Sequence, residues 1–325
     1  MEYTAFAKEV LSFYNVTDPE IDFIRYNENM TFKITDRLHN KCYLLRIHKP
    51  ATEGLFGIQH TLEGIESEMK ILVQLNQNSI LKIQRPVANN FGEYVTDSSE
   101  LIGRSCYSTL LEWIDGATLT QKEDNINEIA FKLGENLALL HQCLHKYKPN
   151  ENFVRPTYDK DRIDSAIDEL KYCVKIDLFS REDYEIIKEV LTLVKNQIKV
   201  LDLRGDAWGI IHADIQPGNI IINNDNPCLI DFGFCGFGYY LFDLGSAGTV
   251  LESSLRKTFL SGYATKSSFT FDDIKYIEGL IFMDTFVSYP LFMRDNNTWI
   301  KSHASKLCNT LYRDFLEGRE VFYSL

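Results

Sequence analysis

The sequence lacks any cluster of lysine and arginine, and positive charge is in short supply throughout. Its 34 Lys and Arg residues are outnumbered by 46 Asp and Glu residues, which gives a formal net charge of −12. A surface of that sign repels phosphate backbones, so we do not expect a nucleic-acid partner. The acidity fits either plain solubility or the attraction of a cationic substrate, and composition alone leaves both open.

Paired cysteines are also lacking. The seven cysteines are odd in number, and no two of them form a CxxC pair: Cys42, Cys106, Cys143, Cys173, Cys228, Cys235 and Cys308. This usage is typical of reduced thiols in a cytosolic protein, and it argues against a disulfide framework or a zinc site.

Long apolar runs are the third absence. No stretch is long enough to cross a bilayer, and the N-terminal residues MEYTAFAKEVLSFYNV have no basic stretch followed by an apolar one. Their spacing instead predicts an amphipathic helix with Phe6, Val10, Phe13 and Tyr14 facing inward. We therefore expect a cytoplasmic protein with no membrane partner, and the oligomeric state is left open.

The pattern of the 325 residues changes near residue 113. Before that point, alternating residues predict strands and one segment has helical spacing: strands at 31–36, 42–48, 92–96 and 107–113, and a helix at 60–76. After it, the texture is mainly helical: 126–144, 161–175, 181–202, 246–263, 271–289 and 299–317. This predicts an α+β fold with a small β-rich lobe (1–113) and a larger helical lobe (114–325), and a ligand cleft between them.

One compact segment, residues 210–232, interrupts the helices and reads as loop, strand, turn and strand, with the turn at 224–227. It contains HADIQPGN followed by IDFG, which is the arrangement that protein kinases use for phosphoryl transfer. Asp214 fits the carboxylate that receives the proton of the attacking hydroxyl. Asn219 and Asp231 fit the oxygen ligands of Mg²⁺. The alternative is a polar hairpin in which these residues only cap and turn the chain.

A second signal lies in the first lobe. Glu68 falls on the apolar stripe of the predicted helix, so its carboxylate needs a partner. Arg46 alternates with Leu45 and Ile47, which places its guanidinium on the opposite face of the strand. A strand cation paired with a helix glutamate is how kinases grip the nucleotide phosphates, and arginine is able to clamp phosphate. An ordinary structural ion pair is the alternative.

The loop that would cover the nucleotide is not the usual one. No GxGxxG lies between the first two predicted strands, and the segment from Tyr26 to Phe32, which includes Asn29, stands in its place. Backbone amides of a polar turn can still cover phosphates, and a plain turn is the alternative.

At HADIQPGN, IDFGFCGFGYYLFDLG and YLLRIHKP, the sequence resembles the aminoglycoside phosphotransferase and choline kinase superfamily. NENMTF, LLEWIDGATL and LGENLALLHQ resemble its loop, hinge and first large-lobe helix, so the resemblance covers about residues 25–250. It departs from the family in the missing glycines and in Arg46, where the family has lysine.

The resemblance implies a kinase for small molecules that uses ATP or GTP with Mg²⁺. It implies the roles already given for Asp214, Asn219, Asp231, Arg46 and Glu68. It adds structural roles for His212 and for Asp243, which supports the catalytic loop. It also places the adenine edge against the backbone near Glu112, Trp113 and Ile114.

We therefore expect O-phosphorylation of a small molecule that carries a hydroxyl group and an amine. Carboxylates in the unmatched tail would attract such a cation, unless they are a solvated face: Asp272, Asp273, Glu278 and Asp284. One rival is a protein kinase, although no activation segment ending in APE follows Asp231. The other rival is a non-catalytic kinase-like protein, such as the spore-coat members of the superfamily.

Three other sequence features are not assigned a catalytic or metal-binding role. His141 and His145 have the spacing of a zinc helix but lack the intervening glutamate, so core or cap histidines are expected. Cys235 is expected to be a small core residue. Arg155 follows a turn and is assigned no role.

Overall fold

The computed structural model describes residues 2–26, 29–49, 57–78, 80–102, 105–178, 180–293 and 306–323. The chain forms two compact units. The first comprises residues 1–119, 142–156 and 219–235, and the second comprises 120–141, 157–218 and 236–325. The two lobes predicted from the sequence, 1–113 and 114–325, stay a prediction about domain organisation.

The first unit is built on an antiparallel sheet with the strand order β1-β2-β3-β6-β4, in which β5 also pairs with β6. Its strands are β1 (Pro19–Tyr26), β2 (Asn29–Asp36), β3 (Lys41–His48), β4 (Pro86–Val87), β5 (Thr96–Asp97) and β6 (Tyr107–Glu112). The hairpin between β2 and β3 is the one that the alternation predicted. β1 was not predicted, and it forms the edge of the sheet with most of its side chains exposed.

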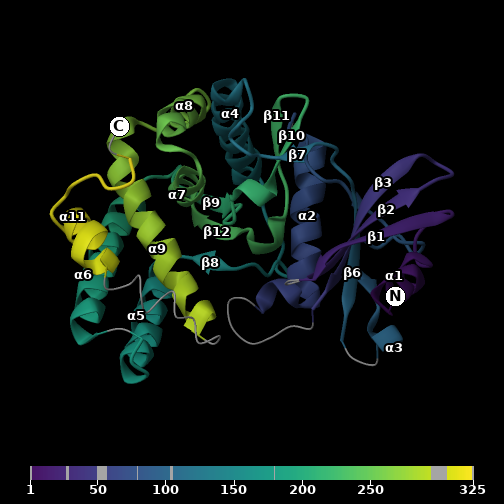
Figure 1. Ribbon diagram of the computed structural model, residues 1–325, viewed down its shortest axis with the longest axis horizontal. Coiled ribbons are helices and arrows are strands. Elements are labelled where there is room, and N and C mark those ends of the chain that lie inside the picture. The colour runs from purple at the N-terminus through teal and green to yellow at the C-terminus, as the bar shows by residue number, and fades with distance from the viewer. Residues whose placement is uncertain are drawn as a thin grey trace. The chain divides into compact units, whose positions relative to one another are not determined.

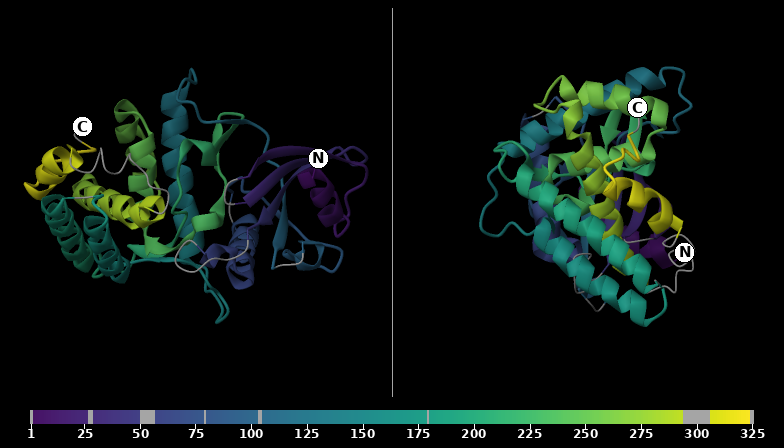
Figure 2. Two further views of the ribbon diagram at one scale, coloured as in Figure 1. Left: turned by 60° about the horizontal axis from the view of Figure 1, so that its bottom comes forward. Right: turned by 90° about the vertical axis from the view of Figure 1, so that its left-hand side faces the viewer.

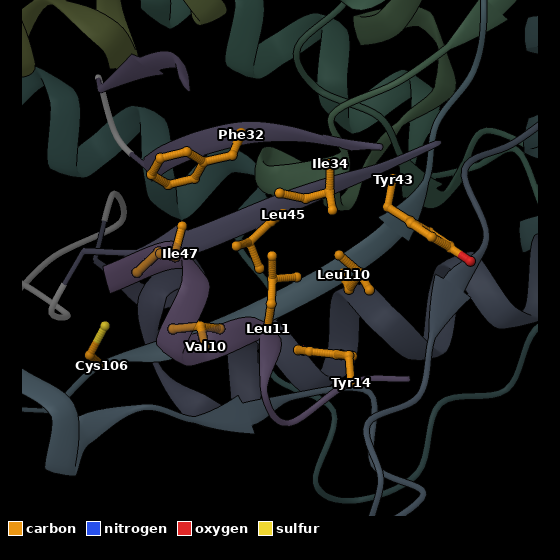
Figure 3. Close-up of a cluster of buried hydrophobic side chains, with 11 residues drawn as sticks. Val10, Leu11, Tyr14, Phe32, Ile34, Tyr43, Leu45, Ile47, Cys106 and Leu110 are labelled. Carbon is orange, nitrogen blue, oxygen red and sulfur yellow. The ribbon is translucent and has the colours of Figure 1, made fainter. Parts of the chain in front are cut away.

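One face of this sheet is covered by helix α1 (Glu2–Leu11). Val10, Leu11 and Tyr14 are buried against Phe32 and Leu45 in a single apolar cluster, which Figure 3 shows between the helix and the strands. The amphipathic N-terminal helix is therefore confirmed, with Phe6 and Phe13 partly buried at its margin. Because Leu45 and Ile47 point into this cluster, Arg46 between them points away from it.

Helix α2 (Leu62–Asn78) follows a short 3₁₀ turn, Ile58–His60, in the same unit. A short helix, α3 (Ser99–Ile102), lies between β5 and β6. A second, three-stranded sheet has the order β11-β10-β7, with β7 at Ala117–Thr118, β10 at Ile220–Asn223 and β11 at Asn226–Leu229. Its hairpin turn is tighter than predicted, since Asn224 and Asp225 alone form it, with φ of 49° and 59°. Asparagine and aspartate tolerate this left-handed backbone better than most residues do.

The second unit is mainly helical. Its short sheet has the order β8-β12-β9, with β8 at Thr157–Tyr158, β9 at Trp208–Ile211 and β12 at Gly236–Tyr239. Its helices are α5 (Lys160–Lys175), α6 (Arg181–Leu201), α7 (Tyr240–Val250), α8 (Ser253–Ala264), α9 (Ile274–Met293) and α11 (Arg313–Leu316). Helix α4 (Ile126–His145) begins in this unit and ends in the first.

Helices α5, α6 and α9 pack side by side, as Figures 1 and 2 show. Local sequence fixes where two of them begin. The Asp159 carboxylate caps α5, and Ser180 forms a capping box with Asp183 at the start of α6. Helix α9 also packs on α7, where Gly245 leaves room for Ile281.

Several predicted elements differ from the structure. The strand expected at 92–96 is wrong, because this stretch is mostly turn and only Thr96–Asp97 pairs in the sheet. The helix expected at 246–263 is two helices, α7 and α8, separated at Leu251 and Glu252. The helix expected at 299–317 lies partly outside the described residues, and its described part is helical to Leu316.

No helix within the described residues is both long and apolar enough to cross a bilayer.

Candidate active site

The first unit contains the predicted pairing of Arg46 with Glu68. Nη2 of Arg46 lies 2.8 Å from Oε1 of Glu68, and the two side chains are 4% and 2% exposed. The two atoms are not aligned as a hydrogen bond, so the contact is an ion pair. A buried charge needs a partner, and each of these residues supplies the other's. The ion pair that the strand and helix periods predicted is confirmed, and its role in binding phosphate stays a prediction.

Breaking this pair gives a testable result. Arg46→Gln and Glu68→Gln should each lower kcat/KM. In free-energy terms, the loss in the double variant should be smaller than the sum of the two single losses, with a coupling energy of roughly 0.5–3 kcal/mol. The cycle is measured on kcat/KM for the nucleotide. Glu63→Gln is the matched control, because Glu63 is exposed on the same helix and its effect should add to that of Arg46→Gln. Additive losses for Arg46 and Glu68 would mean that the ion pair does not act as a unit in the reaction.

Arg46 also faces Asp231. Its Nη1 lies 3.8 Å from Oδ1 of Asp231, while its Nε donates a hydrogen bond to Oγ1 of Thr109 at 3.3 Å. Nη2 of Arg25, from β1, lies 3.6 Å from the other oxygen, Oδ2. A carboxylate that is one-third exposed therefore sits between two guanidinium groups. Arg25 was missed from the sequence because the strand that carries it was not predicted.

The backbone around Asp231 is unusual and brings Asn219 close. Asp231 has a φ of 63°, in the left-handed region, and a 3₁₀ turn, Phe232–Phe234, follows it. The N–H of Ile230 donates to the carbonyl of Asn219 at 3.0 Å, so the two predicted metal ligands lie on neighbouring backbone segments. A non-glycine residue in this conformation carries strain, which is common at functional sites.

The predicted nucleotide contacts lie in the same unit. Asn29 pairs with His48 in the β2–β3 ladder, and its side-chain oxygen is buried with no hydrogen-bond partner among the described residues. At the end of β6, the N–H groups of Glu112 and Trp113 already donate to backbone carbonyls. The Ile114 N–H has no hydrogen bond to another described residue. It remains available as a donor for an adenine edge, and that role stays a prediction.

The second unit holds the loop of Asp214. Asp243, fully buried on α7, accepts hydrogen bonds from the backbone N–H groups of His212 and Ala213 at 2.7 and 2.8 Å. Its Oδ2 also lies 2.9 Å from Nε2 of His141, whose other ring nitrogen lies 2.8 Å from the Tyr263 hydroxyl. These contacts fit the supporting role implied for Asp243, and they make His141 the core histidine that the sequence analysis expected.

Asp214 itself is held in a defined orientation. Ala213 has a φ of 62°, a strained value for alanine, and its bond to Asp243 holds it there. The Asp214 N–H donates to Nδ1 of His212 at 3.3 Å, and Nε2 of Gln216 lies 3.2 Å from each carboxylate oxygen. The fully buried His212 ring thus serves the loop as a structural acceptor, and the partly exposed carboxylate of Asp214 is presented by the loop.

Only one of the four tail carboxylates is close to this loop. Asp273 caps a turn and pairs with Arg204 at 2.7 Å, and Glu278 accepts three backbone N–H groups near the C-terminus. Asp272 is exposed. Asp284, on α9, differs: burial and the nearby carboxylates of Asp214 and Asp243 raise its pKa to about 7. The structure shows no hydrogen bond or ion pair between Asp284 and another described residue.

Comparison with known proteins places these features in a family. A sequence model described as the phosphotransferase enzyme family matches residues 26–276, more than half of the chain. An uncharacterized protein of Synechocystis is 25% identical over 223 residues, covering 66% of this chain. The chain spans about 60% of the length of that curated relative.

Two solved structures resemble the whole chain. A microcompartment-associated aminopropanol kinase aligns with a TM-score of 0.76 at 20% identity, covering 97% of this chain and 98% of its own. An amicoumacin kinase in complex with AMP-PNP, Ca²⁺ and Ami aligns with a TM-score of 0.75 at 16% identity, covering 98% and 94%. At these identities the likeness shows the fold, and it confirms the predicted kinase-like α+β class.

Proposed function

Because the chain belongs to the phosphotransferase enzyme family, we propose that it transfers the γ-phosphoryl group of ATP or GTP to a hydroxyl of a small, amine-bearing molecule. The observation that carries the proposal is the position of Arg46, whose guanidinium reaches Glu68 on one side and Asp231 on the other. Phosphoryl transfer depends on positioning and on neutralising charge, and this arrangement supplies both.

The residues present fit a magnesium ion. Asp231 offers a carboxylate and Asn219 an amide oxygen, which are the hard ligands that Mg²⁺ prefers. Within the described residues, no group of three or more His, Cys, Asp and Glu side chains is arranged to hold a metal. Two protein oxygens suffice for Mg²⁺, since phosphates and water complete its coordination. When bound, the ion neutralises charge on the β- and γ-phosphates.

The proposed step is an in-line displacement. The acceptor oxygen bonds to the γ-phosphorus, and its proton passes to the carboxylate of Asp214. The bond from that phosphorus to the bridging oxygen breaks, and the nucleoside diphosphate leaves. Arg46 pairs with the phosphates before and during the transfer, held at its angle by Glu68 and Thr109.

Asp284 supports an acceptor that carries an amine. Its carboxylate lies close enough to Asp214 and Asp243 for them to perturb it, and it has no cation beside it among the described residues. An ammonium group placed there would relieve the repulsion among the three carboxylates. One of the similar structures is named for aminopropanol, which is itself an amine-bearing alcohol.

Asp284→Asn should therefore raise KM for an amine-bearing acceptor about tenfold or more, since a hydrogen bond to a charged group is worth about 1.5–3 kcal/mol. Asp284 must be ionised to bind a cation, so in the wild type KM should fall as pH rises through about 7. The variant should lose this dependence. Asp272→Asn, at an exposed site on the same segment, is the matched control. An unchanged KM in Asp284→Asn would remove Asp284 from acceptor binding.

The proposed function is tested by the release of ADP or GDP in a coupled assay with Mg²⁺. Acceptors are offered in matched pairs, such as 1-amino-2-propanol with 1,2-propanediol, together with choline, homoserine, aminoglycosides and sugar alcohols. We expect turnover on amine-bearing members and little on their neutral partners. Equal activity on neutral alcohols would contradict the substrate class. If no acceptor is turned over and no nucleotide is bound, the chain is the non-catalytic kinase-like alternative.

A further inference from the structure

Arg155 is a buried arginine that the proposed reaction does not use. Arg155 lies in the loop that follows α4 and is 5% exposed. It donates hydrogen bonds to four backbone carbonyls: Nε to Cys235 at 2.6 Å, Nη1 to Gly64 at 3.0 Å, and Nη2 to Phe232 at 2.9 Å and to Gly233 at 2.6 Å. A guanidinium presents its donors as a rigid planar fork, so these carbonyls are held in one geometry.

The four carbonyls belong to two parts of the proposed nucleotide site. Three of them lie in the turn directly after Asp231. The fourth, that of Gly64, lies in the first turn of α2, four residues before Glu68. The neighbouring residue adds a further tie to α2, because the Val154 N–H donates to Oγ of Ser67 at 2.9 Å. Arg155 and Val154 thus fasten the Asp231 turn to the helix that carries Glu68.

The charge of Arg155 is unusual for a core position. Within the part of the chain that the structure describes, no carboxylate forms an ion pair with it. The charges of Arg155, Glu68 and Arg46 all act on Cys235, but of the two arginines it is Arg46 that pairs with Glu68. Burying a guanidinium on carbonyls alone is costly, and an apolar side chain would fill the same space more cheaply. The carbonyl clamp is therefore a feature that packing alone does not explain.

We infer that Arg155 is a positioning residue that locks the Asp231 turn to α2, so that the Asp231 carboxylate and the Arg46–Glu68 pair keep one arrangement toward a metal–nucleotide complex. This inference rests on the proposed function. In protein kinases the glutamate helix and the Asp-Phe-Gly turn must both be in place for activity. Here a single side chain joins them, through hydrogen bonds to backbone carbonyls.

The first test measures nucleotide binding against Mg²⁺ concentration by calorimetry, in the wild type, Arg155→Lys and Arg155→Ala. A residue that orients a metal ligand typically alters metal affinity by roughly 10–100-fold. We expect the Mg²⁺ concentration for half-maximal nucleotide affinity to rise by that factor in Arg155→Ala and by less in Arg155→Lys. Arg204→Gln is the control, because Arg204 is an arginine paired with a buried carboxylate, that of Asp273, but lies far along the chain from these residues. It should leave the Mg²⁺ dependence unchanged.

The second test does not depend on nucleotide or activity. Cys235 is fully buried beneath the clamp, and burial raises its pKa to about 12, so it should resist alkylation. Loosening the turn should expose it. In Arg155→Ala, mass spectrometry should find that a maleimide labels Cys235 at least about tenfold faster than in the wild type. Cys173, equally buried on α5, is the internal control and should remain protected.

The outcomes separate the inference from the proposed function. If the wild type itself binds no nucleotide in the presence of Mg²⁺, the proposed function fails, and the Cys235 test still reports on the clamp. If the wild type binds, and a folded Arg155 variant keeps both the wild-type Mg²⁺ dependence and a protected Cys235, the inference is overturned. If maleimide labels both Cys235 and Cys173 in Arg155→Ala, that variant is globally unfolded. The inference is then tested in Arg155→Lys by the same two measurements, the Mg²⁺ dependence and the labelling of Cys235.

Discussion

Replacing Asp214 with asparagine is expected to lower kcat by roughly 10²–10⁴-fold, the usual worth of a positioned general base. Asparagine has nearly the same shape as aspartate but cannot accept the proton of the acceptor hydroxyl. The loop should keep its conformation, because its backbone is held by Asp243, whose carboxylate accepts the N–H groups of His212 and Ala213. The Asp214 side chain takes no part in these hydrogen bonds. KM for the nucleotide should therefore change little.

The variant is checked by steady-state kinetics at saturating nucleotide and acceptor, with thermal unfolding to show that the fold is intact. Asp202→Asn is the matched control: Asp202 lies in the same unit, and its carboxylate accepts a hydrogen bond from the Tyr239 hydroxyl at 2.5 Å. The control should keep kcat within a few-fold of the wild type. A kcat for Asp214→Asn in that same range would exclude Asp214 as the base.

The parts of the site that could be predicted are those whose partners follow from local periodicity. Alternation along one strand placed Arg46 on the opposite face from Leu45 and Ile47, and helical spacing placed Glu68 on an apolar stripe. The buried ion pair could therefore be predicted from two short patterns. The segment around Asp214 and Asp231 was recognisable because its two motifs, HADIQPGN and IDFG, both lie within residues 212–233. In each case the constraint is local, and the sequence displays it directly.

The parts that could not be predicted depend on contacts between distant segments. Arg25 was missed because β1 has mostly exposed side chains and its alternation is interrupted by a register shift between Phe23 and Arg25. Arg155 lies 77 or more residues before the turn that it clamps, and nothing near it in sequence indicates carbonyl partners. Asp273 has a local sign of its structural role in the capping box with Thr270, but nothing near them in sequence shows that Glu278 is structural or that Asp284 lies near Asp214. Such roles follow only from the tertiary fold.

Replacing Asp231 with alanine is expected to abolish the contribution of Mg²⁺ to nucleotide binding. In the proposed site Asp231 is the only carboxylate assigned to the metal, since Asn219 provides a neutral oxygen. Asn219→Ala should therefore weaken the Mg²⁺ dependence less. Both variants are compared with the wild type by calorimetry, using a nucleotide with and without Mg²⁺.

The two flanking arginines allow a second prediction, which concerns the affinity of the variant for metal-free nucleotide. In the described structure the Asp231 carboxylate lies 3.8 Å from Arg46 and 3.6 Å from Arg25, so its removal leaves two guanidinium groups beside the proposed phosphate site. A metal-free nucleotide carries several negative charges, which Asp231 repels and the arginines attract. Asp231→Ala should therefore bind metal-free nucleotide at least as tightly as the wild type while gaining nothing from added Mg²⁺. A variant that still binds more tightly when Mg²⁺ is added, to the same extent as the wild type, would show that Asp231 does not hold the metal.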